Sequence, residues 1–178
     1  MRFLLWIRSR MALLMAPREQ APPPAAVDLL SIRARVALGC ACLDKLCREW
    51  QLLSGKMPEL LDALWEFTST EWLDQWDGRI TALVPSDPEE IPGFLNQDAL
   101  DAARSVLLFD MIHTVHAIGG ENLYCGFVSE YTRVPTERAL QLLSEAGISP
   151  PDWSPFVRST VLERGGWGNP HPASFFQG

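Results

Sequence analysis

Hydrophobic residues recur along most of this chain at the three- and four-residue spacing of an α-helix. Between Val27 and Leu53 they form a heptad-like stripe, the pattern of a helix that packs lengthwise on another helix. The stripe consists of Leu29, Ile32, Val36, Gly39, Leu43, Leu46, Trp50 and Leu53. Ser54-Gly55 then predicts the end of this helix, and Pro58 predicts the first turn of the next.

A second helical pattern runs from Glu59 to about Leu83 and separates apolar from acidic residues. Its apolar side comprises Leu61, Leu64, Trp65, Trp72, Trp76 and Leu83, and its acidic side comprises Glu59, Asp62, Glu66, Asp74 and Asp77. This separation predicts one buried and one solvated face. Thr68-Ser-Thr-Glu71 has the pattern of a capping box, so a break at Thr68 is an alternative to one continuous helix. Three prolines within 84–95 predict that the helix does not continue there.

Four more helices are predicted in the second half of the chain, each bounded by cap residues, prolines or glycines. Their expected ranges are Asn96 or Asp98 to Gly119-Gly120, Asn122 to Thr132, Pro135 to Ala146, and Ser154-Pro155 to Arg164-Gly165. After the third of these, Gly147 fits the left-handed position that ends a helix, with Ile148 folding back on Leu143.

The segment 106–118 is apolar almost all round, which predicts a place at the centre of a bundle. Its central residues should be Val106, Leu107, Met111, Val115 and Ile118. No segment has the alternation of a β-strand. With 178 residues, 47% of them hydrophobic, we predict an all-α, single-domain bundle of about five to seven helices.

We place this helical domain at residues 27–165. A Pro-rich N-terminal arm and linker (1–26) precedes it, and a Gly/Pro-rich C-terminal tail (166–178) follows it, docked through Trp167, Phe175 and Phe176. Residues 1–16 are apolar and basic, but Arg8 and Arg10 interrupt the apolar run and no small-residue cleavage site follows. We therefore expect a cytoplasmic protein without membrane attachment. A targeting signal in 1–16 and a start at Met11 stay open as alternatives.

The charge of −7 is concentrated in the middle of the chain. Residues 51–103 hold eleven acidic and two basic side chains, a net charge of −9. Repulsion from other polyanions disfavours direct binding to nucleic acid or to an anionic membrane. We predict that Glu59, Asp62, Glu66, Asp74 and Asp77 bind a basic protein partner. A solvated face that serves solubility is the alternative.

One group of residues has catalytic chemistry: Asp110, His113, His116 and Glu121. Residues three apart are neighbours on a helix, and imidazoles beside carboxylates are ligands for zinc or a di-metal site. A metal-dependent hydrolase is therefore the alternative function. We favour a structural Asp–His hydrogen bond, because the row winds away from a single point and no second histidine motif exists. Motifs for a nucleophile or a bound phosphate are absent, so we expect a non-enzymatic protein without a cofactor.

The four cysteines do not form a disulfide pattern. Cys40, Cys42 and Cys47 share one helical stretch but lie on different faces or too far apart for a bridge. We expect these three residues and Cys125 to be small buried thiols.

The stretch from Ala103 to Pro150 resembles the DNA-mimic-protein-like domain, a helical bacterial family. The residues that carry the resemblance are Val115-His-Ala-Ile-Gly119-Gly120, then Tyr124, Phe127 and Tyr131, then Ala139-Leu-Gln-Leu-Leu143 and Ala146-Gly147-Ile148. The resemblance implies a non-enzymatic acidic protein that binds a basic partner. A toxin-immunity or DNA-mimic inhibitor is the concrete role that we expect.

Overall fold

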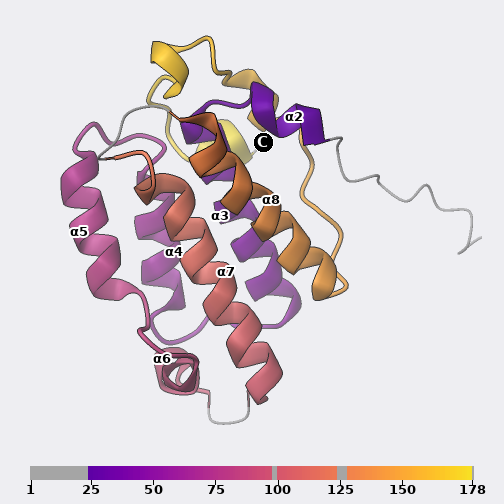
Figure 1. Ribbon diagram of the computed structural model, residues 1–178. Helices are drawn as coiled ribbons and strands as arrows, with labels where there is room; N and C mark the ends of the chain where they lie inside the picture. Colours follow the sequence, from indigo (N-terminus) through magenta and orange to yellow (C-terminus); the bar gives the residue numbers. More distant parts are fainter. Residues whose placement is uncertain (1–23, 98–99, 124–127, 178) are drawn as a thin grey trace, which may run out of the picture.

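Helices make up the fold in the part of the chain that the structure, a computed structural model, describes: residues 24–97, 100–123 and 128–177 (Figure 1). These ranges contain eight α-helices, and their β structure is limited to an isolated antiparallel bridge between Leu30 and Thr160. The predicted all-α helical bundle is therefore confirmed. The N-terminal arm up to residue 23 lies outside the described residues. None of the described helices is long and apolar enough to cross a membrane.

Five helices have ten or more residues and form the body of the bundle. They are α3 (Ile32–Glu49), α4 (Met57–Glu66), α5 (Leu73–Leu83), α7 (Ala102–Gly120) and α8 (Ser129–Glu145). Shorter elements connect and flank them: α2 (Pro24–Leu29), η1 (Pro88–Glu90), α6 (Ile91–Leu95), η2 (Phe156–Arg158), η3 (Arg164–Gly166) and α9 (Ser174–Gln177). The α-helices outnumber the predicted five to seven because three of the eight have six residues or fewer.

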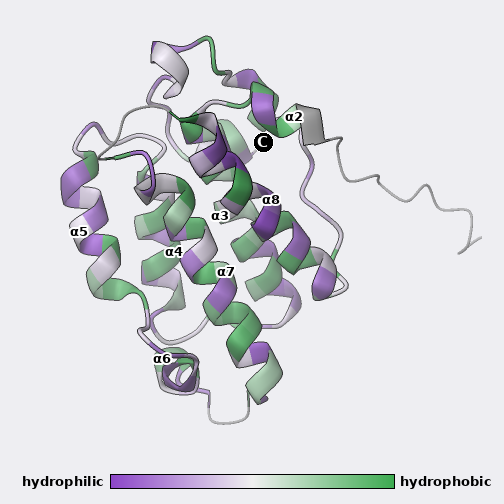
Figure 2. Ribbon diagram, in the orientation of Figure 1, coloured by the Kyte–Doolittle hydropathy of each residue, from purple (hydrophilic) through white to green (hydrophobic). Residues whose placement is uncertain are grey.

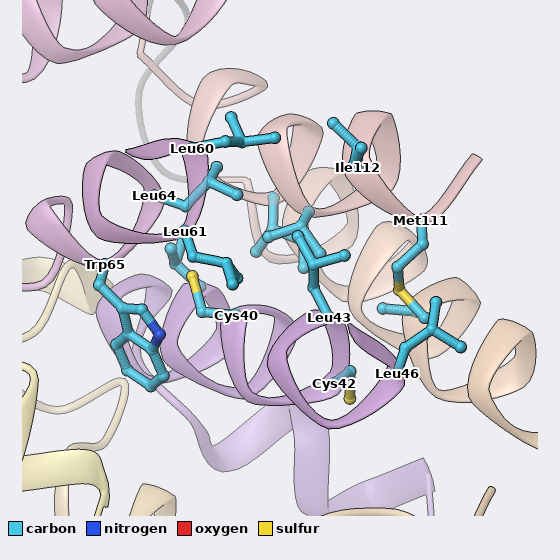
Figure 3. Packing of buried hydrophobic residues seen from close by; sticks show 14 of the residues in the cluster. Cys40, Cys42, Leu43, Leu46, Leu60, Leu61, Leu64, Trp65, Met111 and Ile112 are labelled. Carbon is cyan, nitrogen blue, oxygen red and sulfur yellow. The ribbon is translucent and has the colours of Figure 1, made fainter. Parts of the chain in front are cut away.

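The most buried helix is α3, which contacts α4, α7, α8, η2 and α9 (Figure 1). In Figure 3, Met111 of α7 points toward Leu46 of α3, and Leu43 of α3 and Leu60 of α4 belong to the same buried cluster. Gly39 lets α3 pack closely on α7, since a Cβ atom there would lie 2.6 Å from Ile118 Cδ1. Within α3, Ile32, Val36, Leu43 and Leu46 of the heptad-like stripe are buried as predicted, whereas Leu29 and Leu53 at its two ends are 64% and 42% exposed.

The predicted centre of the bundle is correct for three residues of α7 and wrong for two. Met111, Val115 and Ile118 are fully buried. Val106 is 48% exposed and Leu107 is half-buried, because the first turns of α7 contact η1 and α6 at the end of the bundle. The cap of α7 is Asp101, which accepts a hydrogen bond from Arg104 N at 2.9 Å. Asn96 instead ends α6 in the left-handed conformation, and Asp98 lies outside the described residues.

The predicted helix from Val27 to Leu53 is interrupted at residues 30–31. Ser31 caps α3 by accepting from Ala34 N at 3.2 Å, and its hydroxyl also hydrogen-bonds the Ser159 hydroxyl at 2.8 Å. Leu30 pairs with Thr160, so a distant segment holds this part of the chain extended. The same pairing explains why the predicted helix from Ser154 to Arg164 is wrong. Only the 3₁₀ turns η2 and η3 form in that segment.

The acidic segment contains two helices, so the alternative break near Thr68 is confirmed. The capping box is wrong: the buried Thr68 hydroxyl lies 2.9 Å from the carbonyl oxygens of Trp65 and His171, and no side chain caps α5. The chain turns here, and α5 runs back beside α4 (Figure 1). Because of this turn, the indole of Trp72 is 68% exposed and does not enter the core as predicted.

A single helix, α8, replaces the two helices that were predicted to end at Thr132 and begin at Pro135. Pro135 lies inside α8, where it cannot donate the usual backbone hydrogen bond. Arg35 anchors the first turn of α8 and Thr136 Oγ1 donates to Thr132 O at 2.7 Å, so contacts on both sides hold the helix together. The predicted end of α8 is confirmed by Gly147, with a φ of 75°.

The C-terminal segment packs on the bundle through aromatic residues. Phe176 of α9 is 1% exposed and belongs to the same buried cluster as the residues of α3. Trp167 and Phe175 pack against that cluster. His171 N donates to Thr68 O at 2.8 Å, which ties this segment to the loop between α4 and α5.

Candidate functional site

The five predicted partner-binding carboxylates come from two antiparallel helices. Glu59, Asp62 and Glu66 lie on α4, and Asp74 and Asp77 lie on α5. Glu59, Asp62 and Asp74 are exposed to solvent. None of these three carboxylates has an ion pair with another described residue. Figure 2 shows hydrophilic residues along α5, which lies at the edge of the bundle.

Glu66 has a counter-charge that the sequence pattern did not reveal. Its carboxylate forms an ion pair with Arg79 of α5, and the two side chains are 42% and 48% exposed. Exposed pairs of this kind stabilise a fold by about 1 kcal/mol or less. The pair links α4 to α5, so Glu66 carries less uncompensated charge than its three exposed neighbours.

Asp77 faces α7 and is not part of the outer acidic surface. Its Oδ1 atom lies 3.1 Å from His116 Nε2, and both side chains are about four-fifths buried, with 22% and 20% exposure. The His116 ring also contacts Trp76, with ring centroids 5.8 Å apart. The break between α4 and α5 sets this orientation, because α5 must turn Trp76 into the core beside Gly119. The assignment of Asp77 to the outer acidic face is therefore wrong.

The histidine row of α7 is divided between different partners. His113 Nε2 lies 2.9 Å from Pro85 O, to which it donates a hydrogen bond, and its ring packs on Phe109. Asp110 lies 4.0 Å from Arg138 of α8 and does not orient His113. The predicted hydrogen bond between Asp110 and His113 is therefore wrong, and His116 instead pairs with Asp77 of α5.

Glu121 lines a small hollow of about 340 Å³ together with Asp77, His116, Ala117 and Gly120. Among residues 24–97, 100–123 and 128–177, no three His, Cys, Asp or Glu side chains converge as metal ligands. The four residues of the alternative hydrolase site are therefore not brought together as a ligand set.

Two buried arginines at the start of α3 are structural features that sequence reasoning missed. Arg35 is fully buried and donates five hydrogen bonds, all to carbonyl or hydroxyl oxygens. The closest contacts of its guanidinium are Ser129 O and Thr132 Oγ1, both at 2.7 Å. Burial lowers the pKa of Arg35. The signal in the sequence for this burial was the run of small residues in α3. Small side chains let neighbouring elements cover the helix on every side.

Arg33 holds the loop that carries Trp72. Its guanidinium donates to Phe67 O and, at 2.8 Å, to Thr70 O. Burial, with a smaller contribution from the positive charge of Arg164, lowers the pKa of Arg33 to about 10. Thr70 Oγ1 in turn accepts from Trp72 N at 3.1 Å. A chain of contacts from the core thus fixes the backbone from which the exposed indole projects.

The cysteines are inert parts of the core where the structure describes them. Cys40, Cys42 and Cys47 are buried free thiols, as predicted (Figure 3 shows Cys40 and Cys42). Burial raises the pKa of Cys42 and Cys47 to about 12, so neither thiol ionises at neutral pH. Cys125 lies outside the described residues.

Comparison of the chain with protein-family models, curated proteins and solved structures found no match.

Proposed function

We propose that this protein is a non-enzymatic interaction protein that binds a basic protein partner through the outer surface of α4 and α5. The observation that carries the proposal is the exposed indole of Trp72 between two exposed carboxylates, Glu71 and Asp74. An apolar ring of this size, held outside the core by a fixed loop, has the character of an interface anchor. Tryptophan is among the residues that dominate the binding energy of protein interfaces.

The carboxylates around this anchor support a basic partner. Glu59, Asp62 and Asp74 are exposed without ion pairs among the described residues, whereas Glu71 is paired with Arg164 at 3.2 Å. Uncompensated negative charge accelerates the encounter with a positively charged surface and disfavours acidic partners. The indole then supplies the apolar contact that charge alone does not provide.

An inhibitor of the toxin-immunity or DNA-mimic type is the concrete form that we propose. In either form, the acidic surface would cover a basic groove of its partner. A DNA mimic has one further property, because duplex DNA would compete with it for the same partner. Competition by a DNA duplex at fixed ionic strength therefore separates the DNA-mimic form from other basic-partner binders.

The test begins with capture of the partner on the immobilised full chain at low salt, followed by mass spectrometry. Association rates are then measured against ionic strength for the wild type, Asp62→Lys, Asp74→Lys and Trp72→Ala. Glu49→Lys is the matched control, since Glu49 is exposed on α3 and undergoes the same charge change elsewhere. We expect the two α4–α5 reversals to slow association and flatten its salt dependence, and Trp72→Ala to accelerate dissociation. If Glu49→Lys had the same effect as the other charge reversals, the proposal that the partner binds the α4–α5 surface would be rejected.

A further inference from the structure

A second feature of the acidic segment is a groove between η1, α6 and the first turns of α7. It has a volume of about 520 Å³, within the range of pockets that hold small ligands. Its apolar wall consists of Pro88, Pro92, Leu100, Ala102 and Val106. Figure 1 shows α6 at the end of the bundle where α7 begins, away from the loop that carries Trp72.

Two carboxylates stand at this apolar wall, from Asp87 and Glu89. Asp87 Oδ1 accepts a hydrogen bond from Glu89 N at 2.8 Å and caps η1, which fixes the position of its carboxylate. Neither acid has an ion pair among the described residues. The nearest base along α7, Arg104, is directed elsewhere: its guanidinium lies over the Trp50 ring and within 3.5 Å of Asp101.

A serine that is largely buried also lines the groove. Ser105 is 5% exposed, and its side chain makes no hydrogen bond with any described residue. A hydroxyl oxygen has lone pairs that accept hydrogen bonds, so this side chain can accept from a donor that enters the groove. Prolines at two wall positions also keep the surface preformed, which lowers the entropy cost of binding.

We propose that this groove binds an arginine side chain of a short basic segment, flanked by an apolar residue. The inference rests on the proposed function, because the segment belongs to the same basic partner. An arginine side chain has an apolar stem and a planar cationic head with five donors. The stem packs on Pro88, Pro92 and Val106, and the head reaches Asp87 and Glu89. The Ser105 hydroxyl accepts one further N–H.

The test uses a defined probe and the full chain. The peptide Ac-Leu-Arg-Leu-NH₂ is titrated into ¹⁵N-labelled protein at low salt, and amide shifts are followed by NMR. The control peptide carries citrulline in place of arginine, a neutral residue of nearly the same shape. We expect saturable shifts at Glu89, Ser105 and Val106, and about tenfold weaker binding of the citrulline peptide, a difference of ~1.4 kcal/mol.

Variants assign the binding to the groove. Glu89→Gln should weaken the arginine peptide about tenfold, by loss of a charge-assisted contact. Glu49→Gln, the same change on α3, should leave binding unchanged. Val106→Lys puts a cation at a position that is 48% exposed and should abolish binding with the fold intact. Equal affinity for both peptides, shifts confined to α4 and α5, or the absence of saturable shifts would each overturn the inference. Peptide binding without any captured partner would instead reject the proposed function alone.

Discussion

Replacing Gly119 with alanine tests the close packing of α5 on the last turn of α7. A Cβ atom at this position would lie 2.6 Å from Trp76 Cη2 and 3.1 Å from Phe67 Cδ2. The indole has no room to move, since Trp76 is 1% exposed and its Nε1 donates to Ala63 O at 2.8 Å. Overpacking of a well-filled core costs about 1–3 kcal/mol. We expect a destabilisation of this size from the clash itself.

The neighbouring Gly120 provides a matched control. A Cβ atom there would lie 3.6 Å from Asp77 Oδ1 and 3.9 Å from His116 Nε2, which are ordinary contact distances. Both substitutions gain helix propensity, at most ~1 kcal/mol each, so this gain largely cancels when the two variants are compared. Gly119→Ala should therefore be less stable than Gly120→Ala by about 1–3 kcal/mol. For a domain of this size the difference corresponds to ~2–12 °C in Tm.

Unfolding in urea, followed by far-ultraviolet circular dichroism, measures both free energies. The comparison is valid when the two variants share one m-value, because the surface exposed on unfolding is then the same. A Gly119→Ala protein as stable as Gly120→Ala would refute the reasoning. In that case α5 would not be seated on α7 through Trp76 as the structure has it.

The remaining predictions concern the buried cation, the thiols, the Asp–His pair and the exposed indole. Arg35→Met should lower the free energy of unfolding by about 3–5 kcal/mol, because it leaves several buried acceptors unpaired; a loss under ~1 kcal/mol in urea unfolding would contradict this. In a Cys125→Ser protein, the buried thiols should react with Ellman's reagent only after denaturant is added. Burial raises the pKa of Cys42 and Cys47 to about 12, so these thiols ionise at a lower pH in the unfolded chain than in the folded protein. The free energy of unfolding should therefore fall as pH rises from ~9 towards ~12. A double-mutant cycle with Asp77→Asn and His116→Gln should give a coupling of about 0.5–1 kcal/mol, and zero coupling would rule out the pair. Trp72→Ala should change stability by no more than ~0.5 kcal/mol in thermal melts, and a larger loss would show that the indole supports the fold.

The sequence predicted those parts of the fold that depend on local periodicity. The stripe on α3 and the buried positions on α7 follow from the regular geometry of a helix, which holds wherever the helix is continuous. The predictions failed where distant segments decide the backbone. Ser31 begins α3 because Ser159 lies beside it, and Pro135 stays inside α8 because Arg35 anchors that helix. No pattern within a short window contains these partners.

The sequence predicted which segment holds the candidate site, but not where all of its side chains point. The excess of acidic residues identified the segment, and Glu59, Asp62 and Asp74 are exposed as expected. The directions of Asp77 and Trp72 depend on how α5 is rotated after the turn at residues 67–72. A helical projection that assumes one continuous helix therefore placed both residues on the wrong side.

The hydrogen bonds of Arg35 also constrain the order in which the protein can fold during synthesis. Two of the acceptors of this buried cation, Ser129 O and Thr132 Oγ1, are 94 and 97 residues further along the chain, and the partner of the Ser31 hydroxyl is 128 residues away. While α3 leaves the ribosome, the Arg35 guanidinium is therefore hydrogen-bonded mainly to water. Burying this charge at that stage would cost free energy. The hydrogen bond between the Ser31 and Ser159 hydroxyls can form only after Ser159 has been made. The domain should consequently fold as one late, cooperative unit, with the long-range contacts at the start of α3 formed last.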